Sequence, residues 1–160
     1  MNAPGSDEIA AFEELRPRLF GIAYRMTGSV ADAEDVCQEA WLRWRAVDPA
    51  AVTTPEAYLV RTVTNLAIDR LRSAQHRRET YVGPYLPEPL LADDDPAAAA
   101  ELSDSLTLAF LVLLDELSPV ERAVLLLHDV FGYEFDDVAA AVGRSSTACR
   151  QIASRTRHAR

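Results

Sequence analysis

The feature that most constrains the fold of this chain is a stretch near its middle that neither a helix nor a central strand can cross. Between Tyr81 and Pro96, in YVGPYLPEPLLADDDP, the 160-residue sequence gathers four of its nine prolines, a glycine and three consecutive aspartates. Proline lacks a backbone donor and fixes φ, so it interrupts regular elements. We therefore expect a flexible, acidic, proline-rich linker over residues 81–105 that separates a domain at 1–80 from a domain at 106–160.

Both predicted domains are helical. Apolar residues recur at helical spacing in each of them, and neither shows strand-like alternation over a useful length. The predicted fold class is all-α, with a small helical bundle followed by a small helix-turn-helix domain. Cores of this size are marginally stable when alone. We therefore expect partner binding to stabilise both domains.

Charge is distributed unevenly along the chain. The net charge of -9 argues against a general nucleic-acid binder, because like charges repel phosphate. However, residues 81–117 hold eight acids and no base, whereas residues 143–160 hold five arginines and no acid. Residues 61–80 hold five arginines and two acids. Two basic segments thus flank an acidic middle.

The C-terminal domain begins with a strong helix-start signal. Ser118 stands at an N-cap, a proline follows at the first helical position, and Glu121 completes a capping box. Apolar residues then recur at helical spacing as far as Gly132, which offers the left-handed conformation that ends a helix. This pattern predicts one helix that ends at Gly132.

Two further helices are predicted after it. One begins near Glu134 and ends at Gly143, and the next is capped by Ser145 or Ser146. Helix, glycine turn and helix form the helix-turn-helix pattern, whose second helix enters the major groove. The pattern favours DNA contact over an ordinary solvated cationic face. On the last helix we expect Cys149, Ile152 and Ala153 to face inward and Arg150, Gln151, Ser154, Arg155 and Arg157 to face outward.

The N-terminal domain is predicted to contain three helices. The first carries an apolar stripe from Phe12 to Met26 before Gly28, the second follows Ser29, and Thr54-Pro55 opens the third. Apolar stripes on the second and third helices are expected to pack inward, with either Leu66 or Ala67 in the core. The residues left outside are Asp32, Asp35, Gln38, Glu39 and Arg43 on the second helix and Arg61, Asn65, Asp69, Arg70 and Arg72 on the third.

The sequence carries no pattern typical of an enzyme, a metal site or a membrane protein. The three histidines lie far apart, and neither a phosphate-binding glycine loop nor a Gly-x-Ser-x-Gly turn occurs. His128 and Asp129 are adjacent, and adjacent helical residues point in different directions, so we expect no dyad. We expect no catalysis, cofactor or metal, buried reduced thiols at Cys37 and Cys149, and a cytoplasmic location without a signal peptide or membrane span.

Three motifs in order resemble a known family. DAEDVCQEAWLRW, PEAYLVRTVTNLAIDRLR and LSPVERAVLLLHDVFGYEFDDVAAAVGRSSTACRQIASRTR are similar to regions 2 and 4 of the sigma-70 superfamily of bacterial transcription initiation factors. The resemblance is to the compact extracytoplasmic-function branch. It implies a factor that binds core RNA polymerase and directs it to promoters, with region 2 melting the -10 element and region 4 reading the -35 element.

The resemblance also implies roles for particular residues. An acidic face binds the coiled coil of the polymerase's largest subunit, and region 4 lies at the polymerase flap. The loop from Val47 to Thr54 helps to hold the -10 region, where a base is flipped from the melted strand. The implied residues are Asp32, Asp35, Gln38 and Glu39 for core polymerase, Asn65, Asp69, Arg70 and Arg72 for the -10 element, and Arg150, Gln151, Ser154 and Arg155 for the -35 element.

A narrower resemblance concerns the linker. YVGPYLPEPL is similar to the linker motif of the group that carries a SnoaL-like regulatory domain after region 4. The sequence ends at Arg160 without such a domain. We expect either a naturally short protein or one from which the domain was removed, so regulation by that domain or by an anti-sigma factor stays open.

Two other functions fit parts of the pattern. The first alternative hypothesis is a stand-alone helix-turn-helix regulator that binds duplex DNA as a dimer without polymerase. The second alternative hypothesis is a helical interaction module that has lost DNA binding. DNA binding with and without core polymerase separates these hypotheses.

Overall fold

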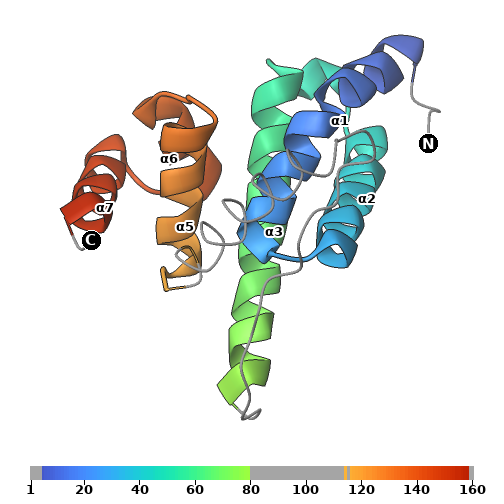
Figure 1. Cartoon of the computed structure of the whole chain (residues 1–160). Helices are drawn as coiled ribbons and strands as arrows, with labels where there is room; N and C mark the ends of the chain where they lie inside the picture. Colours follow the sequence, from blue (N-terminus) through green and yellow to red (C-terminus); the bar gives the residue numbers. More distant parts are fainter. Residues whose placement is uncertain (1–4, 80–113, 115, 159–160) are drawn as a thin grey trace, which may run out of the picture.

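The structure is a computed structural model that describes residues 5–79, 114 and 116–158, so the linker predicted at 81–105 lies outside the described residues. No strand occurs among the described residues, which confirms the all-α prediction. Three long helices form an N-terminal bundle, and shorter ones form a C-terminal unit beside it (Figure 1). The elements are α1 (Ser6–Thr27), α2 (Val30–Ala46), η1 (Pro49–Ala51), α3 (Pro55–Glu79), α5 (Pro119–Leu125), η2 (Leu126–Val130), α6 (Phe135–Val142) and α7 (Ser146–His158).

The N-terminal bundle buries the predicted apolar stripes. Helix α1 ends where Gly28 adopts a left-handed conformation with φ of 70°, as its position in the sequence predicted. On α3, Ala67 is buried and Leu66 only partly so, which settles the choice between them. The buried stripes consist of Phe12, Leu19, Ile22, Ala23 and Met26 on α1, Val36, Cys37, Ala40 and Trp44 on α2, and Leu59, Val63, Ala67 and Leu71 on α3.

Polar contacts fix the start of α2 and the position of its end. The Ser29 side-chain oxygen accepts a hydrogen bond from the Asp32 backbone N–H at 3.2 Å, so Ser29 caps the helix. Near the C-terminal end of α2, the Trp44 indole Nε1 donates a hydrogen bond to the Glu8 carbonyl of α1 at 2.8 Å. Trp44 is therefore anchored in the core with its single donor satisfied.

The C-terminal unit starts as predicted. Ser118 and Glu121 form the full capping box: the Glu121 N–H donates to the Ser118 side chain at 3.2 Å, and the Ser118 N–H donates to the Glu121 carboxylate at 3.0 Å. The helical segment ends before Gly132, whose φ is 76°, as predicted, but its last residues, Leu126–Val130, form a π-helical turn, η2, in place of α-helix. The extra residue of this turn brings Phe131 to α1, where its ring lies over Gly21 and leaves little room for a larger side chain there.

The helix-turn-helix follows the predicted boundaries closely. Glu134 is the N-cap of α6, and Gly143 ends it with φ of 72°. The Ala148 N–H donates to the Ser145 side chain at 3.0 Å, so Ser145 is the cap of α7. Ser146 instead donates to the Asp136 carboxylate at 2.5 Å and ties α7 to α6. The turn therefore holds the two helices in a fixed relation.

The two units pack against each other, which the sequence did not predict. Helices α5 and α6 lie against α3, and η2 lies against α1 (Figure 1). Arg122 of α5 is buried, and its Nη1 donates to the Met26 carbonyl near the end of α1 at 2.5 Å. Carbonyls at a helix C-terminus lack intrahelical partners, and a cation there also complements the helix dipole. Arg122 therefore fastens the C-terminal unit to the bundle.

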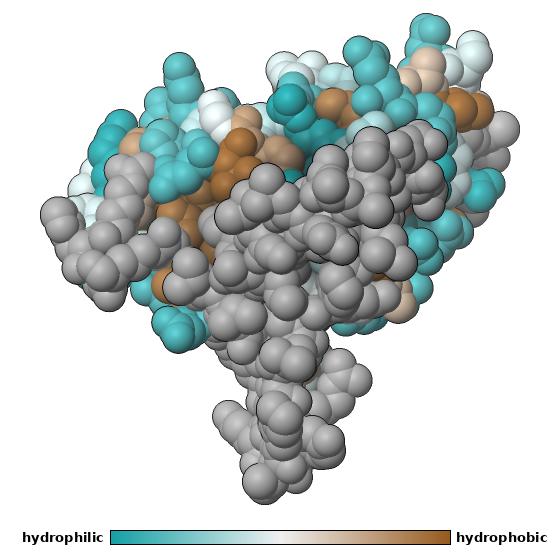
Figure 2. All heavy atoms as spheres, viewed as in Figure 1, coloured by the Kyte–Doolittle hydropathy of each residue, from teal (hydrophilic) through white to brown (hydrophobic). Residues whose placement is uncertain are grey.

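The visible surface is mostly polar. In Figure 2, hydrophilic residues cover much of the coloured face, and the largest hydrophobic area lies on the side of the C-terminal helices. No helix in the described part of the chain is long and apolar enough to cross a membrane.

Candidate nucleic-acid interface

Helix α7 presents the predicted cationic face. Burial of Cys149, Ile152 and Ala153 turns the opposite side of the helix outward, as predicted. The Arg150 guanidinium lies 5.6 Å from the Phe135 ring centroid, so an aromatic side chain of α6 supports its position. The four residues predicted to read the -35 element, Arg150, Gln151, Ser154 and Arg155, are all exposed.

Arg155 also acts electrostatically on the start of α5. The Glu121 carboxyl has a lowered pKa, chiefly because it accepts a hydrogen bond from the Ser118 backbone N–H. Its contact with the Ser118 side chain and the positive charge of Arg155 lower that pKa further. The charge of α7 therefore reaches α5 while its guanidinium stays exposed to solvent.

Helix α2 carries the predicted acidic face. Asp35, Gln38 and Glu39 are exposed, and Asp32 is half-buried. Glu39 lies 3.4 Å from the Nε of Arg43 one turn along the same helix. These side chains present excess negative charge and suit a basic partner.

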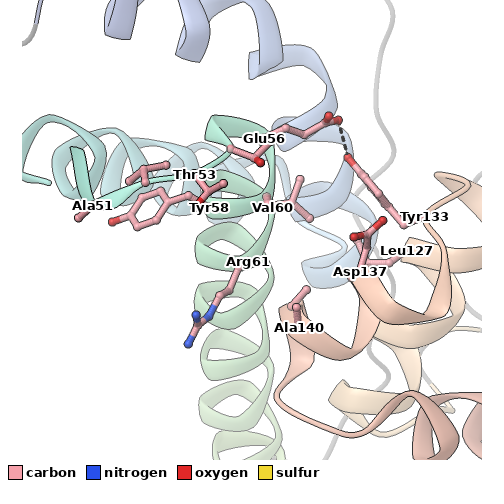
Figure 3. A pocket seen from close by; sticks show the side chains of 14 residues that line it. Ala51, Thr53, Glu56, Tyr58, Val60, Arg61, Leu127, Tyr133, Asp137 and Ala140 are labelled. Carbon is pink, nitrogen blue, oxygen red and sulfur yellow. Dashed lines mark hydrogen bonds between the residues drawn. The ribbon is translucent and has the colours of Figure 1, made fainter. Parts of the chain in front are cut away.

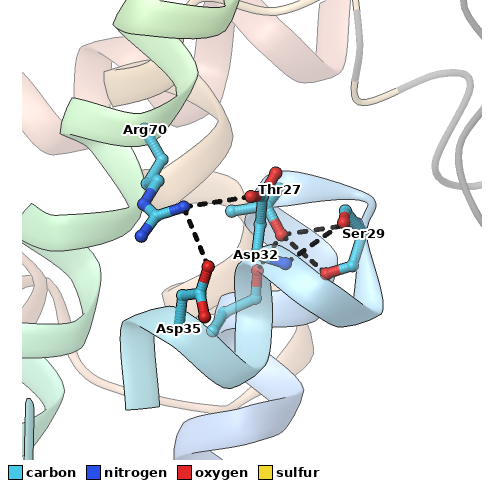
Figure 4. Close-up of polar contacts among 6 residues, drawn as sticks. Thr27, Ser29, Asp32, Asp35 and Arg70 are labelled. Carbon is cyan, nitrogen blue, oxygen red and sulfur yellow. Dashed lines mark hydrogen bonds and ion pairs between the residues drawn. The ribbon is translucent and has the colours of Figure 1, made fainter. Parts of the chain in front are cut away.

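The residues predicted for the -10 element do not form a separate surface. Asp69 and Arg72 are exposed, whereas Asn65 and Arg70 are half-buried. The Arg70 Nη1 lies 3.1 Å from the Asp32 carboxylate and 3.5 Å from that of Asp35 (Figure 4). The structure thus joins one residue predicted for DNA to two residues predicted for polymerase.

A groove lies between α2 and α3 beside this ion pair. It encloses about 390 Å³, and its walls combine apolar and charged side chains. Such a groove accommodates an element of a partner that brings apolar and basic groups together. The lining residues are Asp35, Val36, Gln38, Glu39, Leu66 and Arg70.

The loop predicted to hold the -10 region faces the C-terminal unit across a cavity. The cavity encloses about 410 Å³ and is lined by Val52, Thr53 and Thr54 of the loop and by Asp137 and Ala140 of α6. In Figure 3, Thr53 lies on one side of it and Asp137 and Ala140 lie on the other. The loop therefore lies across this cavity from α6, the first helix of the helix-turn-helix.

A polar cluster closes the edge of that cavity. The Tyr133 hydroxyl donates to the Glu56 carboxylate at 2.9 Å (Figure 3). It accepts from the Arg18 guanidinium at 3.2 Å, and Arg18 and Glu56 are 3.0 Å apart. Burial raises the pKa of Tyr133. Sequence reasoning missed this cluster and Arg122, because no local pattern links residues so far apart in the chain.

The histidine at 128 and the two cysteines lie in surroundings that suit a structural role. His128 Nε2 is 3.9 Å from the Asp129 carboxylate, which is beyond hydrogen-bond distance, and its Nδ1 lies 2.9 Å from the Tyr133 carbonyl. Both cysteines are buried and reduced, and burial raises the pKa of Cys37 to about 11. Within the described ranges, no three His, Cys, Asp or Glu residues are grouped as a metal site would require.

Comparison with known proteins identifies the two units. Residues 11–77 match the Sigma-70 region 2 family, and residues 107–159 match the Sigma-70 region 4 family. The chain is 47% identical over 155 residues to the ECF RNA polymerase sigma factor SigJ of Mycobacterium tuberculosis, covering 95% of this chain and 49% of SigJ. It is 32% identical to the RNA polymerase sigma factor CarQ of Myxococcus xanthus, covering 91% of this chain and 84% of CarQ. The chain belongs to the extracytoplasmic-function (ECF) sigma factors of the sigma-70 family.

Solved structures of sigma factors agree with this fold. The crystal structure of M. tuberculosis SigJ superimposes with a TM-score of 0.72 at 43% identity, covering 94% of this chain and 52% of that one. The sigma factor RpoE of Bartonella quintana, solved with the anti-sigma factor NepR, has a TM-score of 0.63 at 19% identity and covers 91% of both chains, which shows likeness of fold. This sigma factor sequence spans about half the length of its SigJ relative.

Proposed function

We propose that this chain binds core RNA polymerase, directs it to a two-part promoter and helps to open the -10 element. In this proposal the acidic face of α2 binds the polymerase, α3 and the loop before it hold the -10 element, and α7 enters the major groove at the -35 element. The chain itself performs no chemistry, acts in the cytoplasm, and supplies promoter choice and strand opening. The additional regulator in this proposal is an anti-sigma factor or a further regulatory domain.

The observation that carries the proposal is that one chain presents two oppositely charged surfaces on different units. Helix α7 exposes Arg150 and Arg155 after the glycine turn at Gly143, and α2 exposes Asp35 and Glu39. Arginine forks recognise guanine and phosphate, whereas carboxylates suit a basic protein surface. A factor that joins a polymerase to DNA requires both properties.

Promoter binding in this proposal requires the two units to separate. In this proposal the -10 and -35 elements are separate stretches of B-form DNA, whose length grows by about 3.4 Å per base pair. Helix α3, the longest of the described helices at 25 residues, spans only about 37 Å. Since α5 and α6 also pack against α3, the packed arrangement is suited to the free protein. A tether that lets two weak readers act together raises their effective concentration at correctly spaced sites.

The decisive experiment is run-off transcription with core RNA polymerase on a library of promoter fragments. We expect a discrete set of transcripts whose start sites share two sequence elements at constant spacing. A gel-shift assay with and without core polymerase accompanies it, and we expect weak DNA binding by the chain alone.

Each alternative has its own outcome. Equally tight binding to a palindromic duplex without polymerase would support a stand-alone helix-turn-helix regulator. Failure to associate with core polymerase, together with the absence of promoter-specific transcripts, would support an interaction module.

A further inference from the structure

The cluster formed by Arg70, Asp32 and Asp35 connects two surfaces that the proposed function uses separately. Arg70 reaches from α3 to α2, and one of its terminal nitrogens, Nη1, lies within 3.5 Å of both carboxylates. The cluster carries two negative charges and one positive charge, so it retains net negative charge even with Arg70 in place. A basic partner is therefore still attracted to it.

The contacts of Arg70 are exchangeable. The side chains of Arg70, Asp32 and Asp35 are 41%, 39% and 63% exposed, so solvent reaches all three. Exposed ion pairs contribute little net stability because water and salt compete with them. Arg70 can therefore leave the carboxylates at a small cost in free energy when another anion binds Arg70 or another cation binds the carboxylates.

The same contacts oppose DNA binding in the free chain. Two carboxylates beside a guanidinium cancel its attraction for phosphate and repel the phosphate directly. If the carboxylates are taken by a basic surface, the guanidinium loses its partners and its charge becomes available.

We propose that Arg70 is exchanged between two sets of partners: it binds Asp32 and Asp35 in the free protein, and it binds a phosphate of the -10 strand once core polymerase occupies those two carboxylates. Arg70 thereby acts as a coupling residue, and polymerase binding switches on one DNA contact of α3. This inference rests on the proposed function, because it takes the acidic face as the polymerase contact and α3 as the DNA contact.

The Arg70→Gln variant separates this role from a structural one. We expect it to bind core polymerase roughly two- to fivefold more tightly, because the carboxylates lose their internal competitor, and to bind promoter DNA in the holoenzyme more weakly. A residue that only joins α2 to α3 would weaken both activities when replaced. Arg70→Lys, which keeps the charge, should resemble the wild type in both measurements. Unchanged or weaker core binding by Arg70→Gln would overturn the proposal.

The complementary experiment uses the full chain without polymerase. Fluorescence anisotropy measures binding of a fluorescein-labelled oligothymidylate single strand over a potassium chloride titration. The test variant is Asp32→Asn with Asp35→Asn, and the control is Glu14→Gln with Glu34→Gln, which changes the net charge equally at two exposed residues. We expect the test variant to bind roughly two- to fivefold more tightly than the control, with a salt slope steeper by about 0.7 for one added phosphate contact.

Adding Arg70→Gln to the Asp32→Asn, Asp35→Asn variant should remove that gain. Equal affinity of the test and control variants, or a gain that persists without Arg70, would disprove the exchange. Failure of the proposed function looks different: wild-type chain would then not associate with core polymerase at all. The strand-binding result does not depend on polymerase, so the two failures are distinguishable. Urea unfolding of each variant shows whether it is folded.

Discussion

The two basic surfaces of this molecule, on α3 and α7, differ in whether acidic side chains lie beside their arginines. On α3, Arg70 is held by two carboxylates of α2, whereas on α7 the outward arginines lie in a segment that contains no acid. Arg70 is neutralised inside its own domain, whereas Arg150 and Arg155 are exposed to solvent. The difference teaches that net charge alone does not determine which arginines are available to an anionic partner, because the positions of the acids decide this.

The two units also differ in how they are stabilised. The N-terminal bundle has three long helices around a continuous core, whereas the C-terminal unit has short helices that rely on caps, turns and contact with the bundle. Short helices need tertiary contacts to be stable. The following predictions test each side of this comparison, from the largest expected effect to the smallest.

Replacing Arg150 and Arg155 together with alanine should have the largest effect. Bidentate base contacts contribute about 1 kcal/mol or more each, so loss of both should reduce -35-dependent transcription at least about thirtyfold. Core binding should not change, because α2 carries it in our proposal. Run-off transcription and sizing of the holoenzyme measure the two activities. The control is Arg16→Ala with Arg45→Ala, two exposed residues of the bundle, and equal loss in the control would contradict the assignment.

The thiols should report which unit opens first. Burial raises the pKa of Cys37 to about 11 and also raises that of Cys149, so at pH 8 little thiolate is present on either. The rise in the pKa of Cys37 from 9.0 to about 11 lowers its thiolate population about a hundredfold. We expect slow alkylation by iodoacetamide in buffer, with Cys149 reacting before Cys37, and fast alkylation of both in urea. Single Cys37→Ser and Cys149→Ser variants assign the rates, and faster reaction at Cys37 would reverse our ranking of the two units.

Arg122→Met should loosen the contact between the units. The variant keeps an unbranched buried side chain but loses the charged donor to the Met26 carbonyl. Hydrogen bonds of charged groups contribute about 1.5–3 kcal/mol, so the free energy of unfolding should fall by that amount. Urea denaturation measures it, with the exposed Arg144→Met as control. A loss no greater than in the control would show that Arg122 does not fasten the units.

The capping box of α5 should give the smallest effect. Ser118→Ala should cost about 1 kcal/mol of stability. The folded pKa of Glu121 lies below its usual value of 4.5, so its contribution is present above that pH and is lost as the pH falls through the lowered pKa. Acid unfolding should therefore be less steep in Glu121→Gln than in wild type, with Glu14→Gln as a surface control. Identical acid unfolding of wild type and Glu121→Gln would contradict this role.

The helices and their inward faces could be predicted because their signals are local. Ser118 with Glu121, the glycines at 28 and 143, and the apolar stripes each depend on neighbours a few residues away. The exposure of Arg150 and Arg155 followed from the same periodicity. Their role in DNA binding remains a prediction from the family resemblance.

The contacts between distant segments could not be predicted in this way. Arg70 with Asp32 joins residues on different helices, and Arg122 with Met26 joins the two units. A single sequence contains no periodic signal for such pairs. The π-helical turn was missed for a related reason, since it gains its advantage from the contact of Phe131 with α1.

That π-helical turn also sets the tolerance of this segment to changes in length. Each residue of a helix rotates the following chain by about 100°. Deleting one residue between Leu126 and Val130 would restore ordinary helical geometry but swing Phe131 and Tyr133 away from the side chains of α1. The contacts of Phe131 and Tyr133 with α1 thus depend on the one additional residue of the π-helical turn. Its loss would leave the capping box of α5 unaltered but would separate the C-terminal unit from α1 at this point.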